Sequence, residues 1–118
     1  LTGNAGTNTI SGAAGNDTLE GMAGADTLIG GTGNDTYRVG RGHGAETVQE
    51  NDSTSGNVDV GQFLADIAPD QIWFLRSSND LVASIIGTQD QMTVQNWYAG
   101  SQYHLEQFRT ADGATLLD

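Results

Sequence analysis

Four oxygen-bearing side chains recur at a fixed interval near the start of this chain. Asn8, Asp17, Asp26 and Asp35 stand nine residues apart. Carboxylate and amide oxygens are the side-chain ligands that hard divalent cations, calcium above all, take in proteins. Because each copy is isolated along the sequence, a cation site needs a fold that brings successive copies together.

The residues around these four positions repeat at the same interval. The units are GNAGTNTIS (3–11), GAAGNDTLE (12–20), GMAGADTLI (21–29) and GGTGNDTYR (30–38). Glycine opens each unit and returns three residues later. The acid or amide is followed by threonine and then by one large apolar residue, which is Ile10, Leu19, Leu28 or Tyr37. Several columns in phase over four units predict a repeat architecture.

Each unit predicts a glycine turn followed by a very short strand. Glycine permits the left-handed backbone of a tight turn, and threonine beside one apolar residue suits an extended segment. Two units then form one coil with a strand on each side, and coils stack into a solenoid. Since stacked strands lie about 4.8 Å apart, Asp17 lies over Asp35 and Asn8 over Asp26. Carboxylates this close repel unless a cation lies between them. Calcium, with ligand distances of about 2.3–2.6 Å, would reach both.

The units resemble the RTX nonapeptide, Gly-Gly-x-Gly-x-Asp-x-(large apolar)-x, of large bacterial secreted proteins. The resemblance implies an all-β fold, in which residues 1–59 form a parallel, right-handed calcium-binding β-roll and residues 60–118 form a small antiparallel β capping region. It also implies that turn carbonyls complete each calcium shell, for about two to four ions in all. The first implied set is Ala13, Gly15 and Asp17 with Gly30, Thr32 and Asp35. The second is Asn4, Gly6 and Asn8 with Gly21, Ala23 and Asp26, and we expect it to be weaker because Asn8 carries no charge.

After Arg38 the strict period fails, but the acid-threonine-apolar pattern returns once. Glu46-Thr47-Val48 follows its predecessor after eleven residues, and a loop insertion of two residues would place Glu46 over Asp26. The glycine-rich segment before it is similar to the end of RTX arrays. A third implied set therefore combines Met22, Gly24, Asp26, the Arg41 and His43 carbonyls, and Glu46.

The polar stretch of residues 50–59 could supply a last acid. Asp59 would then lie over Asp35, with carbonyls from Gly31, Gly33, Thr54 and Gly56. An acidic linker that binds no ion is the alternative interpretation. His43 has only His104 as a second histidine, and without metal-ligand spacing we expect a solvent-facing loop histidine.

Composition supports a cation-binding role and excludes others. Among the 118 residues, 15 are acidic and four are basic, for a net charge of −11. Such a charge disfavours nucleic acid and anionic membranes as partners. Cysteine is absent, which excludes disulfides and thiolate metal sites. Leu1 occupies the apolar position of a unit whose turn is missing, so we expect a piece of a longer protein with further repeats upstream.

Residues 60–118 are richer in apolar side chains and predict an antiparallel meander. The expected strands are Ile72–Arg76, Leu81–Ile86, Gln91–Trp97, His104–Thr110 and Ala114–Leu117. The expected core is Trp73, Phe74, Leu75, Ile85, Val94, Trp97, Tyr98, Leu105 and Phe108. A solenoid that ends exposes apolar side chains and unpaired backbone, so this region would close the last coil.

The function expected is that of a calcium-binding module that folds after secretion from a Gram-negative bacterium. It would be a monomer and a structural part of a larger secreted toxin, enzyme or adhesin exported by the one-step type I route. The alternative is a carbohydrate- or cell-surface-binding domain, in which Trp97 and Tyr98 stack on a sugar ring. No nucleophile–base–acid arrangement is visible, so we expect no enzyme activity.

Overall fold

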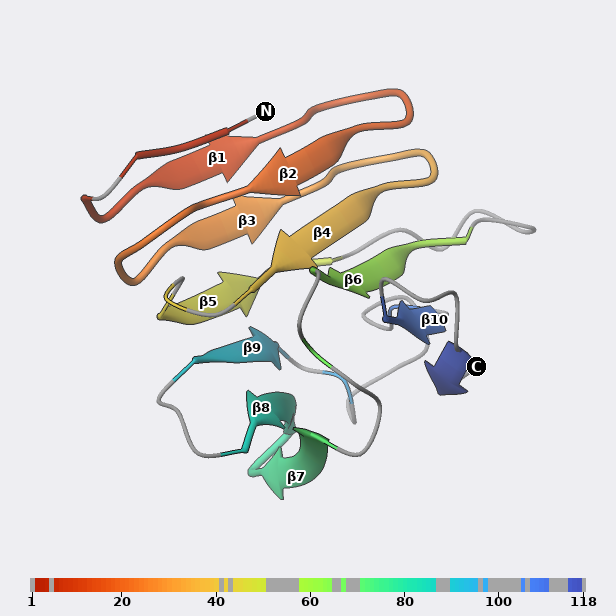
Figure 1. Cartoon of the computed structure of the whole chain (residues 1–118). Helices are drawn as coiled ribbons and strands as arrows, with labels where there is room; N and C mark the ends of the chain where they lie inside the picture. The colour runs from red at the N-terminus through yellow and green to blue at the C-terminus, as the bar shows by residue number, and fades with distance from the viewer. Residues whose placement is uncertain are drawn as a thin grey trace.

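The computed structural model is built from short strands wound into stacked coils (Figure 1). It describes residues 2–4, 6–40, 42, 44–50, 58–64, 67, 71–86, 90–95, 97, 105, 107–110 and 115–117. The first strands are β1 (Thr9–Ser11), β2 (Thr18–Glu20), β3 (Thr27–Ile29), β4 (Thr36–Val39) and β5 (Ala45–Val48). Each begins directly after an acid or amide, or contains one, so the repeat places that side chain where a turn meets a strand.

Alternate strands pair in parallel, as a coil of two nonapeptide units requires. Thr9 is in register with Thr27 in the β1–β3 pair, and Thr18 is in register with Thr36 in the β2–β4 pair. Later coils are longer, since Thr27 pairs with Thr47 and Thr36 with Val60 of β6 (Val60–Phe63). The insertions enlarge the turns and leave the parallel register intact. The fold is therefore the parallel β-roll that the period predicts.

The C-terminal strands continue the two sheets of the roll. They are β7 (Ile72–Ser77), β8 (Asp80–Ile85), β9 (Gln91–Val94), β10 (Gln107–Arg109) and β11 (Thr115–Leu117). One sheet has the order β1-β3-β5-β9-β8-β7 and the other the order β11-β10-β6-β4-β2. Figure 1 shows β9 beside β5 and β10 beside β6.

The expected antiparallel cap is thus only partly correct. The β7–β8–β9 meander and the β10–β11 pair are antiparallel. However, β9 pairs with β5 and β10 pairs with β6 in parallel. The physical reason is that a sheet edge left by the roll offers unpaired N–H and C=O groups, and the next strand in each sheet satisfies them.

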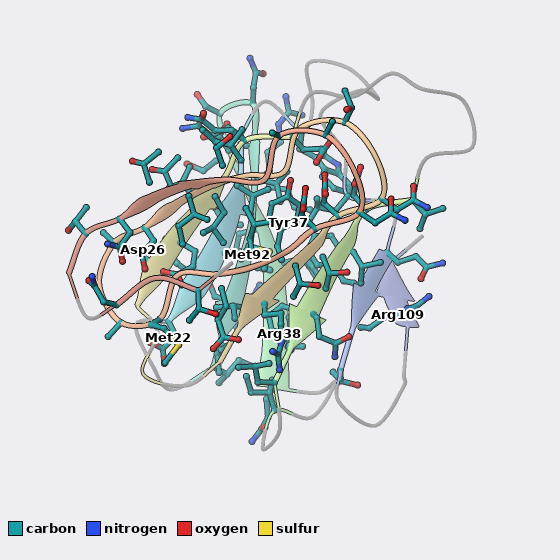
Figure 2. The ribbon with its side chains drawn as sticks, turned by 90° about the horizontal axis from the view of Figure 1, so that it is seen from above. Met22, Asp26, Tyr37, Arg38, Met92 and Arg109 are labelled. Atoms are coloured by element: carbon teal, nitrogen blue, oxygen red, sulfur yellow. The ribbon has the colours of Figure 1, made fainter. Side chains whose placement is uncertain are left out.

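The core lies between the two sheets and takes one to three side chains from each strand whose burial the structure describes. Leu19, Leu28, Tyr37 and Val48 from the repeats are fully buried, and Figure 2 shows Tyr37 and Met92 inside the coils. Phe108 is the aromatic centre of the C-terminal part. It stacks on Phe63, meets Phe74 edge-on and lies 5.9 Å from Trp97 between ring centroids.

Two predicted core residues are instead exposed. Trp73 is 59% and Leu75 48% exposed, whereas Phe74 between them packs against the core. Side chains alternate between the faces of a strand, so β7 can bury only one of the two sets. Within the described part of the chain, no helix has the length and apolarity to cross a membrane.

Candidate calcium-binding turns

The acid of each coil accepts a hydrogen bond from the backbone of the coil before it. The Asp17 amide donates to Oδ1 of Asp35 over 3.0 Å, and the Asn8 amide donates to Oδ1 of Asp26 over 2.7 Å. One oxygen of each aspartate therefore ties two coils together. Oδ2 of Asp17 and Oδ2 of Asp26 are buried without a hydrogen bond.

The first predicted ligand set comes together in adjacent turns. The Thr32 amide donates to the Ala13 carbonyl, and the Gly15 amide donates to the Thr32 carbonyl, each over 3.1 Å. A Cβ on Gly30 would collide with the Asp35 carboxylate, so glycine makes room for that group. The fold thus brings Ala13, Gly15, Asp17, Gly30, Thr32 and Asp35 to one place. Which of their oxygens hold an ion stays a prediction.

The second set is also assembled, with a difference in its first turn. Oδ1 of Asn8 accepts from the Asn4 amide over 2.9 Å, and Oδ1 of Asn4 accepts from the Gly6 amide over 2.8 Å. A Cβ on Gly3 would lie 2.7 Å from the carbonyl oxygen of Gly21. Ala23 lies in the same turn of the next coil as Gly21 and Asp26. The two asparagine side chains thus bond within their own turn, whereas Asp26 and Asp35 accept from the coil before them.

The third set is brought together as far as the structure describes it. The β3–β5 register places Glu46 beside Asp26, as the two-residue insertion predicts. The Gly24 carbonyl oxygen lies 2.9 Å from where a Cβ on Gly44 would be. Met22 occupies the matching turn with a positive φ of 68°, and Figure 2 shows it near Asp26 at the edge of the coils. Arg41 and His43 lie outside the described residues.

The fourth set rests on Asp35 and Asp59. The Asp35 amide donates to Oδ1 of Asp59 over 2.8 Å, and the Val60 amide donates to the Asp35 carbonyl over 2.8 Å. Gly31 and Gly33 both have positive φ in the adjoining turn. Thr54 and Gly56 lie outside the described residues.

Two further acids, Glu50 and Asp90, join the acidic turns and were not predicted from the sequence. Glu50 lies with Asp35 and Asp59, and the Tyr37 hydroxyl donates to its Oε1 over 2.7 Å. Asp90 accepts from the Gly42 and Gly44 amides over 2.9 and 2.8 Å. The available signal for Asp90 was its place directly before a predicted strand, since the repeats also have an acid or amide directly before each strand. The sequence offered no such signal for Glu50, because this residue lies outside the columns of the repeat.

Among the residues that the structure describes, no basic side chain is buried beside these acids. Asp26, Asp35, Glu46, Glu50 and Asp59 are nearly or fully buried. By contrast, the three arginines that the structure describes, Arg38, Arg76 and Arg109, are all exposed, and Arg38 pairs with Glu20 at the surface. Burying ionised carboxylates is costly unless a positive charge compensates them. A bound cation would supply that charge.

Burial among other acids also raises the pKa values of the two buried glutamates. Burial, followed by the Asp26 carboxylate, raises the pKa of Glu46 to about 8, against a smaller opposing effect of the Asp26 backbone amide. Burial also raises the pKa of Glu50 to about 8; Tyr37 opposes this shift and Asp59 adds to it. Both oxygens of Glu46 and Oε2 of Glu50 are buried with no hydrogen bond. A donor set of carboxylates and backbone carbonyls fits calcium, which takes oxygen ligands only.

The proposed sugar-stacking pair has a different setting. Trp97 is partly buried and packs against Phe108 in the core, as the core interpretation predicts. Tyr98 lies outside the described residues.

Comparison with known families agrees with the geometry of both parts of the chain. Residues 2–37 match the RTX calcium-binding nonapeptide repeat (4 copies). Residues 80–118 match the haemolysin-type calcium binding protein related domain. Such repeats are typical of secreted bacterial proteins, and the match makes this chain a calcium-binding module. The chain therefore carries RTX calcium-binding nonapeptide repeats followed by a haemolysin-type calcium-binding related domain.

Proposed function

We propose that this module folds only when calcium binds, and that it does so after export from a Gram-negative bacterium as part of a larger toxin, enzyme or adhesin. The observation that carries the proposal is the stack of buried acids, beside which the described part of the chain buries no basic side chain. In low calcium these carboxylates would repel one another and pay a desolvation cost. With calcium bound, the binding free energy becomes folding free energy.

The composition adds to the cost of folding without metal. The chain holds 17 glycines, whose backbones lose the most conformational entropy on folding, and only 36% of its residues are apolar. The hydrophobic gain is therefore small against the entropy of ordering the turns. An unfolded, acidic chain suits passage through a narrow type I channel, and extracellular calcium would then fill sites with Kd values of about 10⁻⁴–10⁻³ M.

A calcium titration tests this proposal. Far-UV circular dichroism should show a disordered chain in EDTA and β-structure in a few millimolar calcium, about the concentration that such sites need. Magnesium at the same concentration is the control, because it prefers octahedral geometry and retains its waters; it should leave the chain unfolded. A chain with full β-structure in EDTA would contradict the proposal.

We also propose that this region has no catalytic role and acts as a monomer. Three of the acids that could serve as general acids or bases, Asp26, Asp35 and Asp59, already accept hydrogen bonds from the backbone of neighbouring coils. A catalytic activity of the purified module, abolished by Asp17→Asn while calcium-dependent folding remains, would contradict this.

A further inference from the structure

Glu50 lies beyond the nonapeptide units, yet its carboxyl joins two acids of the roll. One carboxylate oxygen each from Asp35, Glu50 and Asp59 lies within 4.8 Å of the others. All three residues are buried, at 0%, 1% and 0% exposure. Asp35 and Asp59 come from adjacent coils of one sheet, whereas Glu50 follows β5 of the opposite sheet.

A tyrosine hydroxyl fixes the position of Glu50. The Tyr37 hydroxyl accepts from the Gly30 amide over 2.9 Å and donates to Oε1 of Glu50 over 2.7 Å. The preceding repeats carry Leu19 and Leu28 in this column, which have no hydroxyl group. Tyr37 thus satisfies one oxygen of Glu50 and leaves the other, Oε2, buried without a hydrogen bond.

We propose that Asp35, Glu50 and Asp59 form a cation site with three carboxylates, which binds calcium more tightly than the stacks with two acids or with an acid and an amide. Three carboxylates around one Ca²⁺ leave a net negative charge, whereas two only neutralise it. Calcium affinity in proteins rises with the number of charged ligands and with the rigidity of the site. The Asp35 amide bond to Asp59 and the Tyr37 bond to Glu50 supply that rigidity.

This inference rests on the proposed calcium-triggered folding and adds the order in which the calcium sites fill. The site joins both sheets at the point where the regular repeats end, because Asp35 precedes β4, Asp59 precedes β6 and Glu50 follows β5. As the tightest site, it would fill first and hold together the coils of irregular length.

Removal of one carboxylate oxygen tests the site. Glu50→Gln should bind one calcium ion fewer than the wild type by native mass spectrometry, and its tightest calcium dissociation constant should weaken by about tenfold or more. Glu20→Gln is the matched control, since it removes the same charge from a glutamate that pairs with Arg38 at the surface. Glu50→Gln with the full number of ions at wild-type affinity, or an equal loss in Glu20→Gln, would overturn the proposal.

Three more variants separate ligation from hydrogen bonding. Asp59→Asn and the double variant Glu50→Gln/Asp59→Asn should lose the same single ion as Glu50→Gln; a loss of two ions in the double variant would mean separate sites and overturn the proposal. Tyr37→Phe keeps all three carboxylates and should retain the ion. Loss of the ion in Tyr37→Phe together with its retention in Glu50→Gln would show that Glu50 serves only as a hydrogen-bond partner.

Terbium provides a readout that does not depend on whether Glu50→Gln folds. Wild-type crystals soaked at low terbium concentration should give their strongest anomalous peak among Asp35, Glu50 and Asp59, because a trivalent ion gains most from three carboxylates. A strongest peak elsewhere, with none at this cluster, would refute the site while leaving calcium-triggered folding intact.

Discussion

Asp35 bonds to acidic residues of both neighbouring coils. Its Oδ1 accepts from the Asp17 amide, its amide donates to Asp59, and its carboxylate belongs to the cluster with Glu50. Asn8, in the outermost stack, is uncharged and bonds to Asp26 through its backbone amide. The two residues occupy the same column of the repeat, so they form a natural pair for mutation.

Asp35→Ala should raise the calcium midpoint of folding by about tenfold or more, since it removes a charged ligand from two stacks. Asn8→Ala should shift the midpoint far less, because it removes a neutral side chain from one stack. Titrations followed by circular dichroism measure both midpoints. A larger shift for Asn8→Ala than for Asp35→Ala would contradict the assignment of the strongest stacks.

Ala13 and Met22 adopt the left-handed backbone conformation that favours glycine. Their φ angles are 69° and 68°, while Gly31 at the same place in its unit has φ 87°. A left-handed conformation costs an L-residue roughly 1–2 kcal/mol. Glycine relieves this cost, but loses about 0.4–1 kcal/mol more backbone entropy on folding. Ala13→Gly and Met22→Gly should therefore stabilise the calcium-bound fold by up to about 1 kcal/mol.

Ala14→Gly is the control for this prediction. Ala14 forms a parallel bridge with Thr32 and does not have a positive φ, so glycine there should destabilise by about 0.5–1 kcal/mol. Urea unfolding at saturating calcium measures all three variants. Destabilisation by Ala13→Gly equal to that by Ala14→Gly would show that the left-handed turn carries no strain.

At the scale of elements, Asp90 connects the turn before β5 to the start of β9. It accepts two hydrogen bonds, from the Gly42 and Gly44 amides. Hydrogen bonds to a charged group contribute about 1.5–3 kcal/mol each. Asp90→Ala should therefore lower the free energy of unfolding by about 2 kcal/mol or more, and Asp90→Asn, which keeps one acceptor oxygen, should cost less. Equal stability of Asp90→Ala and the wild type in calcium would contradict this role.

The turns between elements also make the metal-free fold sensitive to pH. Without metal, the pKa values of Glu46 and Glu50 are raised to about 8 in the folded chain, chiefly by burial. The folded state then binds more protons than the unfolded chain between about pH 4.5 and 8, so its stability falls as pH rises through that range. In EDTA, β-structure should therefore be greater at pH 5 than at pH 8.

Circular dichroism in EDTA across this pH range measures the effect. The double variant Glu46→Gln/Glu50→Gln is the control and should flatten the pH dependence, because it removes both titrating groups. More β-structure in EDTA at pH 8 than at pH 5 would contradict the raised pKa values.

The strictly periodic elements were predictable from sequence, and the aperiodic ones were not. The period of two nonapeptides placed Asp17 beside Asp35, and the Glu-Thr-Val signature placed Glu46 beside Asp26 across a longer turn. Asp90 and Glu50 belong to no column, and Asp90 bonds to Gly44 across 46 residues of sequence. The run Ile-Trp-Phe-Leu in β7 gave no indication of which face is buried, since all four side chains are apolar.

At the scale of the whole molecule, both sheets run from the repeats into the C-terminal strands. β9 extends the sheet of β1, β3 and β5, and β10 extends the sheet of β2, β4 and β6. Neighbouring coils in such a stack stabilise one another, so order in one coil favours order in the next. Cations bound between acids of successive coils would therefore act on one continuous structure, and folding should follow calcium concentration steeply.

The most direct test of this account is a crystal grown in calcium, with data collected for anomalous scattering. The account predicts an anomalous peak between the carboxylates of Asp17 and Asp35, with oxygen ligands at about 2.3–2.6 Å. A folded β-roll in that crystal with no ion between these two side chains would contradict the central claim that cations hold the acidic coils together.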